Sequence, residues 1–82
     1  MASKHDLVEW VAAALEDSGG KARLVDVAKY IWRNHQAELE AAGDLLYTWQ
    51  YDMRWAATAL RRSDQMVDVD DSPRGVWVLK RR

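Results

Sequence analysis

Apolar residues recur at intervals of three and four positions in three segments of the chain, and this spacing predicts three amphipathic helices. The first helix begins at the capping box formed by Ser3-Lys4-His5-Asp6 and ends at Ser18-Gly19-Gly20, where glycine readily adopts the left-handed conformation. The second covers residues 24–35. The segment 36–43, which is rich in Ala and Glu, either extends this second helix or forms a short extra turn.

The third helix is expected to end near Ser63 and to begin at Leu45 or Trp49, with Asp44 or Thr48 as its N-cap. At 100° per residue its apolar positions share one face, namely Trp49, Met53, Ala56, Ala57 and Leu60. This stripe is typical of a helix face that closes a hydrophobic core.

From residue 66 onward the helical spacing gives way to the alternation that is typical of a β-strand. Residues 66–70 alternate apolar and acidic side chains, residues 71–75 read Asp-Ser-Pro-Arg-Gly, and residues 76–80 are β-branched and aromatic. We therefore expect a hairpin, which must lay Trp77 and Leu79 on the helices because an isolated two-stranded hairpin is marginal in water. Residues 21–23 are expected to contribute at most a short piece of strand.

These elements predict an α+β fold that is mostly α, with three helices and a C-terminal two-stranded hairpin in a single domain over residues 1–82. The chain has no cysteine, so its stability depends on apolar packing rather than on disulfides. Hydrophobic residues make up 49%, including five Trp. The sequence lacks an apolar run of membrane-spanning length and an apolar leader, and we expect a cytoplasmic protein without membrane contact.

The charge distribution is uneven along the chain, although the formal net charge is only −1. Residues 1–44 hold five Lys/Arg against eight Asp/Glu, whereas residues 45–82 hold seven against five. A basic total is typical of proteins that bind nucleic acid, and this chain lacks one. The excess of cations in the second half still allows a locally positive surface.

The order of elements and three short stretches resemble bacterial winged-helix domains. The stretches are Gly19-Gly20 before the second helix, the stripe Val27-Ala28-x-x-Ile31, and the closing Arg74-Gly75-Val76-Trp77-Val78-Leu79. Nearly the whole chain is similar in element order to the N-terminal domain of Mrr-type restriction endonucleases. The resemblance implies DNA binding through the third helix and the hairpin, or wing. These 82 residues contain no nuclease domain, so we expect no cleavage activity.

The outer face of the third helix is the strongest candidate binding surface. It carries Tyr51, Arg54, Trp55, Thr58, Arg61 and Arg62, where a merely solvated face would favour Lys, Glu and Gln. Arg54 suits the edge of guanine in the major groove, and Arg61 and Arg62 suit phosphates. Tyr51 and Trp55 are expected either to contact bases or sugars or to be buried beneath the wing or the 36–43 segment.

Two further cations belong to this hypothesis. Arg74 lies in the predicted turn of the hairpin and is a candidate for contact with a phosphate or the minor groove. Arg23 precedes the second helix, whose N-terminus favours a phosphate. For both residues plain solvation is the alternative.

Catalytic and metal-binding patterns are not evident in the sequence. His5 and His35 have no partners at metal-ligand spacing, and the acidic residues 68–71 do not match a calcium loop. We therefore expect no enzyme activity, cofactor or metal. The predicted function is that of a non-catalytic module for double-stranded DNA, such as a small transcriptional regulator. The alternative is a winged-helix module that binds a protein partner or a second copy of itself.

Overall fold

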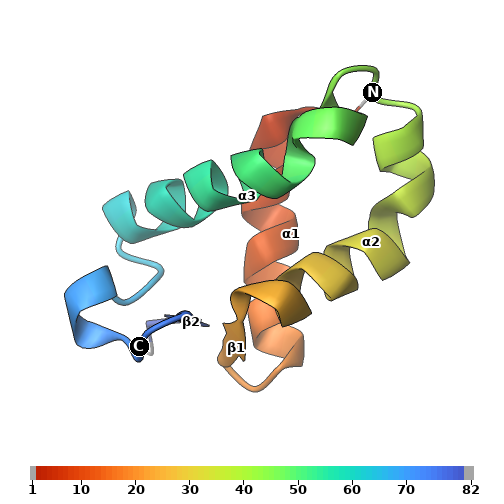
Figure 1. Ribbon diagram of the computed structural model, residues 1–82. Coiled ribbons are helices and arrows are strands. Elements are labelled where there is room, and N and C mark those ends of the chain that lie inside the picture. Colours follow the sequence, from red (N-terminus) through yellow and green to blue (C-terminus); the bar gives the residue numbers. More distant parts are fainter. Residues whose placement is uncertain (1, 81–82) are drawn as a thin grey trace.

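The computed structural model describes residues 2–80, which form three helices and a two-stranded antiparallel sheet (Figure 1). In chain order the elements are α1 (Lys4–Asp17), β1 (Lys21–Arg23), α2 (Leu24–Glu40), α3 (Leu45–Arg62), the 3-10 helix η1 (Val69–Asp71) and β2 (Val76–Val78). The predicted fold class, α+β and mostly α, is confirmed.

Helices α1 and α3 end in the same way, with a residue in the left-handed region. After α1, Gly19 has φ 81° and the N–H of Gly20 donates to the Leu15 carbonyl at 2.7 Å. After α3, Asp64 takes the left-handed position with φ 64°, and the Gln65 N–H donates to the Leu60 carbonyl at 2.8 Å. These bonds satisfy carbonyls that the helix ends would otherwise leave free.

Helix α2 is longer than predicted, because residues 36–40 continue it beyond a kink. His35 departs from helical geometry with φ −131° and ψ 19°. Its ring stacks on Trp10 of α1, with centroids 3.9 Å apart and planes 9° apart, and its Nδ1 is hydrogen-bonded to Glu38 at 2.8 Å. Leu39 beyond the kink is fully buried. The first of the two alternatives for this segment is therefore correct.

The sheet pairs differently from the predicted hairpin. β2 runs antiparallel to β1, with Ala22 opposite Trp77, and the 66–70 segment contributes only a single bridge between Met66 and Leu79. Residues 69–71 form η1 instead of a strand, and Val69 is 64% exposed. The alternation of Val and Asp therefore wrongly predicted a strand, because Val69 faces solvent and does not lie on the buried face of a sheet. The short strand at residues 21–23 is confirmed.

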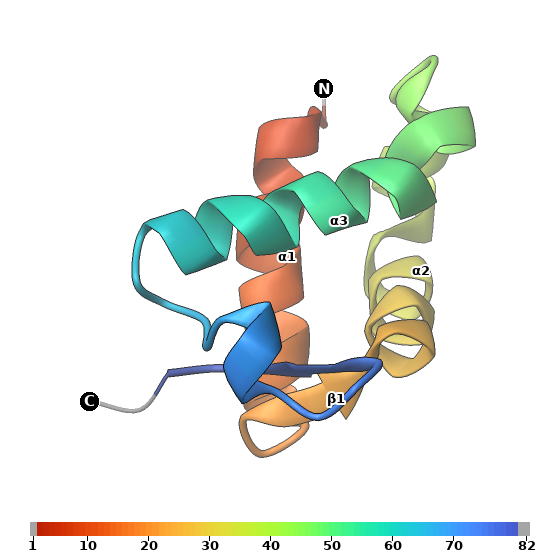
Figure 2. The same ribbon diagram turned by 60° about the vertical axis from the view of Figure 1, so that its left-hand side comes forward.

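The core lies where α1 crosses α3 (Figure 2). Its residues with at most 1% exposure on these two helices are Leu7, Val11, Ala14, Leu15, Ala56, Ala57 and Leu60. The two alanines of α3 let the helix backbones approach closely. Trp77 of β2 is 8% exposed and closes one side of the core, as predicted, whereas Leu79 is half-buried. None of the helices within residues 2–80 has the length and hydropathy needed to cross a membrane.

Candidate nucleic-acid interface

The two faces of α3 separate as the sequence predicts. The five apolar residues assigned to the core face are all buried. The helix begins at Leu45 after Asp44, and Thr48 lies inside it with its hydroxyl donating to the Asp52 carboxylate at 2.8 Å. The apolar face holds α3 against the core, and the opposite face is presented to solvent.

Exposed side chains form a ridge along α3 at intervals of four, three and four residues. The ridge consists of Tyr47, Tyr51, Arg54 and Thr58, with Tyr47 85% exposed and Tyr51 78% exposed. Burial of Tyr51 is therefore wrong. Tyr47 was missed in the sequence, although its four-residue spacing from Tyr51 is a usable signal. The hydroxyl of Thr58 donates to the Arg54 carbonyl at 3.2 Å, so its methyl group is the part left for an external contact.

Three arginines converge on one depression beside this ridge. The side chains of Arg54 and Arg61 and the loop residue Arg74 line it together with Thr58 and Trp77. The loop is held there by the backbone, because the Leu24 N–H donates to the Gly75 carbonyl at 3.3 Å and β2 pairs with β1. In Figure 2 the loop (blue) runs below α3 to the start of α2, and β2 leads back from there toward the C-terminus.

Arg61 has a structural contact as well as a place in this depression. It is half-buried, and its Nε donates to the Val67 carbonyl at 3.4 Å. This bond ties the end of α3 to the segment that leads into η1. The geometry therefore fixes the direction of the Arg61 guanidinium, whereas Arg54 and Arg74 are exposed.

Trp55 is half-buried against the first turn of α1, a cover that differs from the two expected from the sequence. Lys4 Nζ lies 4.6 Å from the Trp55 ring centroid, and the His5 ring is edge-on at 5.3 Å. Trp55 lines a second depression with Lys4, Tyr51, Asp52, Arg54 and Thr58. The ridge formed by Arg54 and Thr58 thus separates two hollows, of which only this one has a carboxylate in its wall.

The remaining two predicted site residues lie outside the Arg74 depression. Arg62 is exposed at the end of α3 and does not line it. Arg23 is exposed and binds Asp26 through both ends of its guanidinium, Nε to Oδ2 at 3.0 Å and a terminal nitrogen to Oδ1 at 3.4 Å. This hydrogen bond raises the pKa of Arg23 and lowers the pKa of Asp26. The carboxylate offsets the charge that Arg23 was expected to offer a phosphate.

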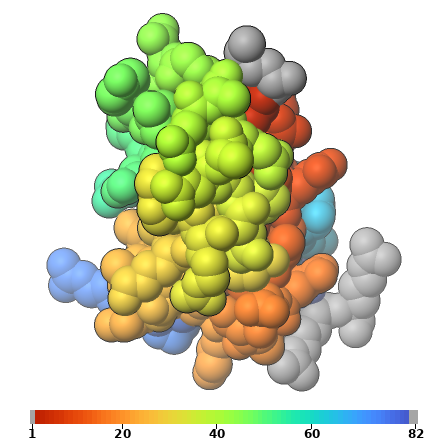
Figure 3. All heavy atoms as spheres, turned by 90° about the vertical axis from the view of Figure 1, so that its right-hand side faces the viewer, coloured from red at the N-terminus to blue at the C-terminus, as the bar shows by residue number. Residues whose placement is uncertain are grey.

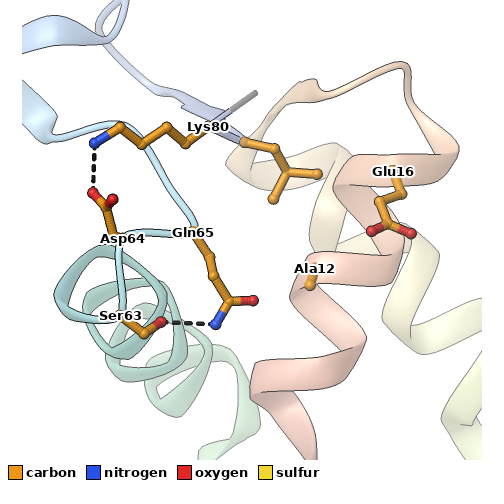
Figure 4. A pocket seen from close by; sticks show the side chains of 7 residues that line it. Ala12, Glu16, Ser63, Asp64, Gln65 and Lys80 are labelled. Atoms are coloured by element: carbon orange, nitrogen blue, oxygen red, sulfur yellow. Dashed lines mark hydrogen bonds and ion pairs between the residues drawn. The ribbon is translucent and has the colours of Figure 1, made fainter. Parts of the chain in front are cut away.

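A different hollow lies between α1 and the end of α3 (Figure 4). Its charged residues are of both signs: Glu16 on one wall and the ion pair of Lys80 with Asp64 on the other. The hydrogen bond that the Lys80 ammonium donates to the Asp64 carboxylate raises the pKa of Lys80. The Gln65 amide donates to the Ser63 hydroxyl at 2.8 Å. Because its cation is already paired, this hollow is a poor site for an anion.

Residues 2–80 contain no cluster of three or more His, Asp or Glu side chains that could hold a metal ion. Comparisons of the chain with protein-family models, with curated proteins and with solved structures found no match. The exposed surface along α3 is therefore the strongest candidate for a binding site.

Proposed function

We propose that this chain is a non-catalytic winged-helix module that binds double-stranded DNA through α3 and the loop before β2. The observation that carries the proposal is the convergence of Arg54, Arg61 and Arg74 on one depression that no carboxylate lines. Phosphate contacts provide most of the affinity of such proteins, and cations gathered on one surface are what these contacts need. The net charge of −1 does not oppose this, because the local potential is what the DNA experiences.

The proposed roles follow from the position of each side chain. An α-helix fits the major groove, and Arg54 at the middle of the exposed ridge is placed to donate two hydrogen bonds to guanine. Arg74 in the loop, and Arg61 at its fixed angle, are placed for phosphates on the flank of the groove. Tyr51 supplies contact area beside Arg54. We further propose that a module with these contacts acts as a small transcriptional regulator, and that it does so in the cytoplasm.

Titration of a fluorescent duplex by anisotropy at about 50 and 200 mM salt tests the proposal. We expect binding that weakens steeply with salt, and a loss of roughly fivefold or more in affinity for Arg54→Ala or Arg74→Ala. Arg33→Ala is the matched control, because Arg33 is exposed on α2 and lines none of the depressions along α3. Binding that is insensitive to salt and to both substitutions would show that the surface has another role.

A protein-interaction module is the second candidate, and a specific observation favours it. Large apolar side chains are exposed on α2 and α3, namely Val25 at 47%, Trp32 at 38%, Tyr47 at 85% and Tyr51 at 78%. Exposed aromatic residues are enriched at protein interfaces. Light scattering over a range of concentrations tests for self-association, since a homodimer gives a mass that rises with concentration, and a strict monomer would weaken this candidate.

A further inference from the structure

Helices α2 and α3 enclose a groove of which the duplex contact described above uses only one end, at Tyr51 and Arg54. Two neighbouring depressions share Val25, Ala28 and Gln50, so they lie side by side between the two helices, and together they are called the groove. One end lies at Trp32, and the other reaches Leu24 and Arg54, which also line the Arg74 depression. Figure 3 shows the first turns of α3 (green) against α2 (yellow to yellow-green), with the loop before β2 (blue) projecting below them.

The lining of this groove combines apolar surface with cations. Its floor and walls include Ala28, Leu46, Trp49 and Met53, with Lys29 at one end and Arg54 at the other. No Asp or Glu lines the groove or the Arg74 depression that continues it, although the chain has 13 acidic residues. Gln50 lies at the middle, and its amide offers both a donor and an acceptor.

An aromatic stack stands at the far end of the groove. Trp32 lies parallel to Trp49, with planes 8° apart and ring centroids 6.1 Å apart. Trp49 is 6% exposed, whereas Trp32 is 38% exposed. The two rings are parallel but offset, and the exposed part of Trp32 is available for contact with a third flat ring.

We infer that this groove binds unpaired nucleotides that continue from a DNA duplex seated on α3. Bases would stack on Trp32 and on Tyr51, and Lys29 would neutralise a phosphate between them, while Arg54 stays with the duplex where the groove begins. Gln50 would hydrogen-bond to a base edge. The inference rests on the proposed function for the duplex part and extends it to a junction between paired and unpaired DNA.

The charges favour this occupant over a segment of a partner protein. An apolar groove alone would suit the side chains of an amphipathic helix equally well. Here the cations are spaced along the groove and continue to Arg74, and this matches a ligand with one negative charge per nucleotide. A single stranded segment leaving the duplex would pass directly from the Arg74 depression into the groove.

The test compares one duplex sequence with blunt ends and with a single-stranded extension of about five nucleotides, at the 5′ or at the 3′ side. Base stacking contributes on the order of 1 kcal/mol or more, which corresponds to about fivefold in affinity. We expect one of the extensions to tighten binding by about fivefold or more. Trp32→Ala should remove this gain and leave blunt-duplex affinity unchanged, while Trp32→Phe should retain most of the gain.

Tyr47→Ala is the matched control, because Tyr47 is the most exposed large apolar side chain on α3 and does not line the groove. It should keep the full effect of the extension. If neither extension tightens binding to a protein that still binds the blunt duplex, the groove inference fails and the proposed function stands. If no duplex binds in a salt-sensitive way, the proposed function fails, and the inference that rests on it fails with it. Self-association that Trp32→Ala abolishes would assign the groove to a second copy of the chain and overturn the inference.

Discussion

The Arg74 depression and the hollow between α1 and the end of α3 both contain cations, but the cations differ in whether they are paired. Arg54, Arg61 and Arg74 line the first without a carboxylate in its wall. In the second, Lys80 binds Asp64, and Glu16 lines the opposite wall (Figure 4). The difference shows that the arrangement of charges, and not their total, distinguishes a surface suited to an anion from one that is already neutralised.

The largest expected effect comes from breaking the core that positions both hollows. Leu60 is 1% exposed and lies in the last turn of α3. Arg61 of this turn lines the Arg74 depression, and Ser63 and Asp64, directly after the helix, line the other hollow. Leu60→Ala should lower the free energy of unfolding by about 2–5 kcal/mol, because it removes buried methyl groups and leaves a cavity. Urea denaturation measures this loss. Thr58→Ala on the exposed side of the same helix should cost far less, and equal losses would contradict the placement of the two faces.

Charge reversal sharpens the comparison directly. Arg74→Glu places a carboxylate in the acid-free depression, and we expect duplex affinity to fall by roughly tenfold or more at low salt. Lys80→Glu changes the net charge by the same amount in the paired hollow and should have a much smaller effect. Anisotropy titrations of the two variants at equal salt provide the measurement. Equal losses would mean that only the total charge matters.

Removing the carboxylate of Asp26 should free the Arg23 guanidinium to contribute to DNA binding. In Asp26→Asn the carboxylate charge is gone, and we expect duplex affinity to rise by about two- to threefold. Arg23→Ala in the same background should abolish the gain. If the double variant kept the higher duplex affinity, the increase would not be due to Arg23.

The same pair makes a small contribution to stability that depends on pH. The pKa of Asp26 is lowered in the folded protein by its hydrogen bond from Arg23. The contribution is therefore present above the pKa of Asp26 in the unfolded chain and is lost as the pH falls through its lowered folded value. Thermal unfolding from neutral to acidic pH should show a slightly shallower decline for Asp26→Asn than for the unaltered protein.

The smallest expected effect is that of Asp64→Asn, which removes the partner of Lys80. Asn tolerates the left-handed conformation that Asp64 adopts, so the end of α3 should be preserved and Tm should change by only a few degrees. Duplex affinity should stay within about twofold, because Lys80 lies away from the Arg74 depression. A large gain in affinity would show that the paired hollow is a latent binding surface, and this would end the distinction between the two.

Local signals in the sequence predicted most of the helical framework. The capping box at Ser3, the glycines after α1 and the apolar stripe of α3 depend on contacts within a few residues, and all of these are confirmed. The signals failed at η1 and at the kink. Val69 follows an alternating pattern but has no partner strand, because β1 occupies one edge of β2 and the chain turns after its single bridge at Met66.

The candidate site was predictable only in part. The helical period placed Tyr51, Arg54 and Thr58 on the outer face of α3, and the structure agrees. The cover of Trp55 by Lys4 and His5 depends on residues about 50 positions apart, so no local pattern indicated it. Arg23 and Asp26 are only three residues apart, but the sequence also allowed Arg23 to be free for a phosphate. The structure shows the guanidinium bound to the Asp26 carboxylate.

By itself, the sequence determined which residues are helical, which side of α3 is apolar and where the cations lie along the chain. These properties follow from backbone preference and side-chain periodicity, which act over a few residues. Only the tertiary structure decided that Arg74 lines the same depression as Arg54 and Arg61, that Asp64 pairs with Lys80, and that Trp32 lies parallel to Trp49 beside a groove that no Asp or Glu lines. The physical reason is that electrostatic and stacking contacts depend on distance in space, and the packing of α1 against α3 sets those distances.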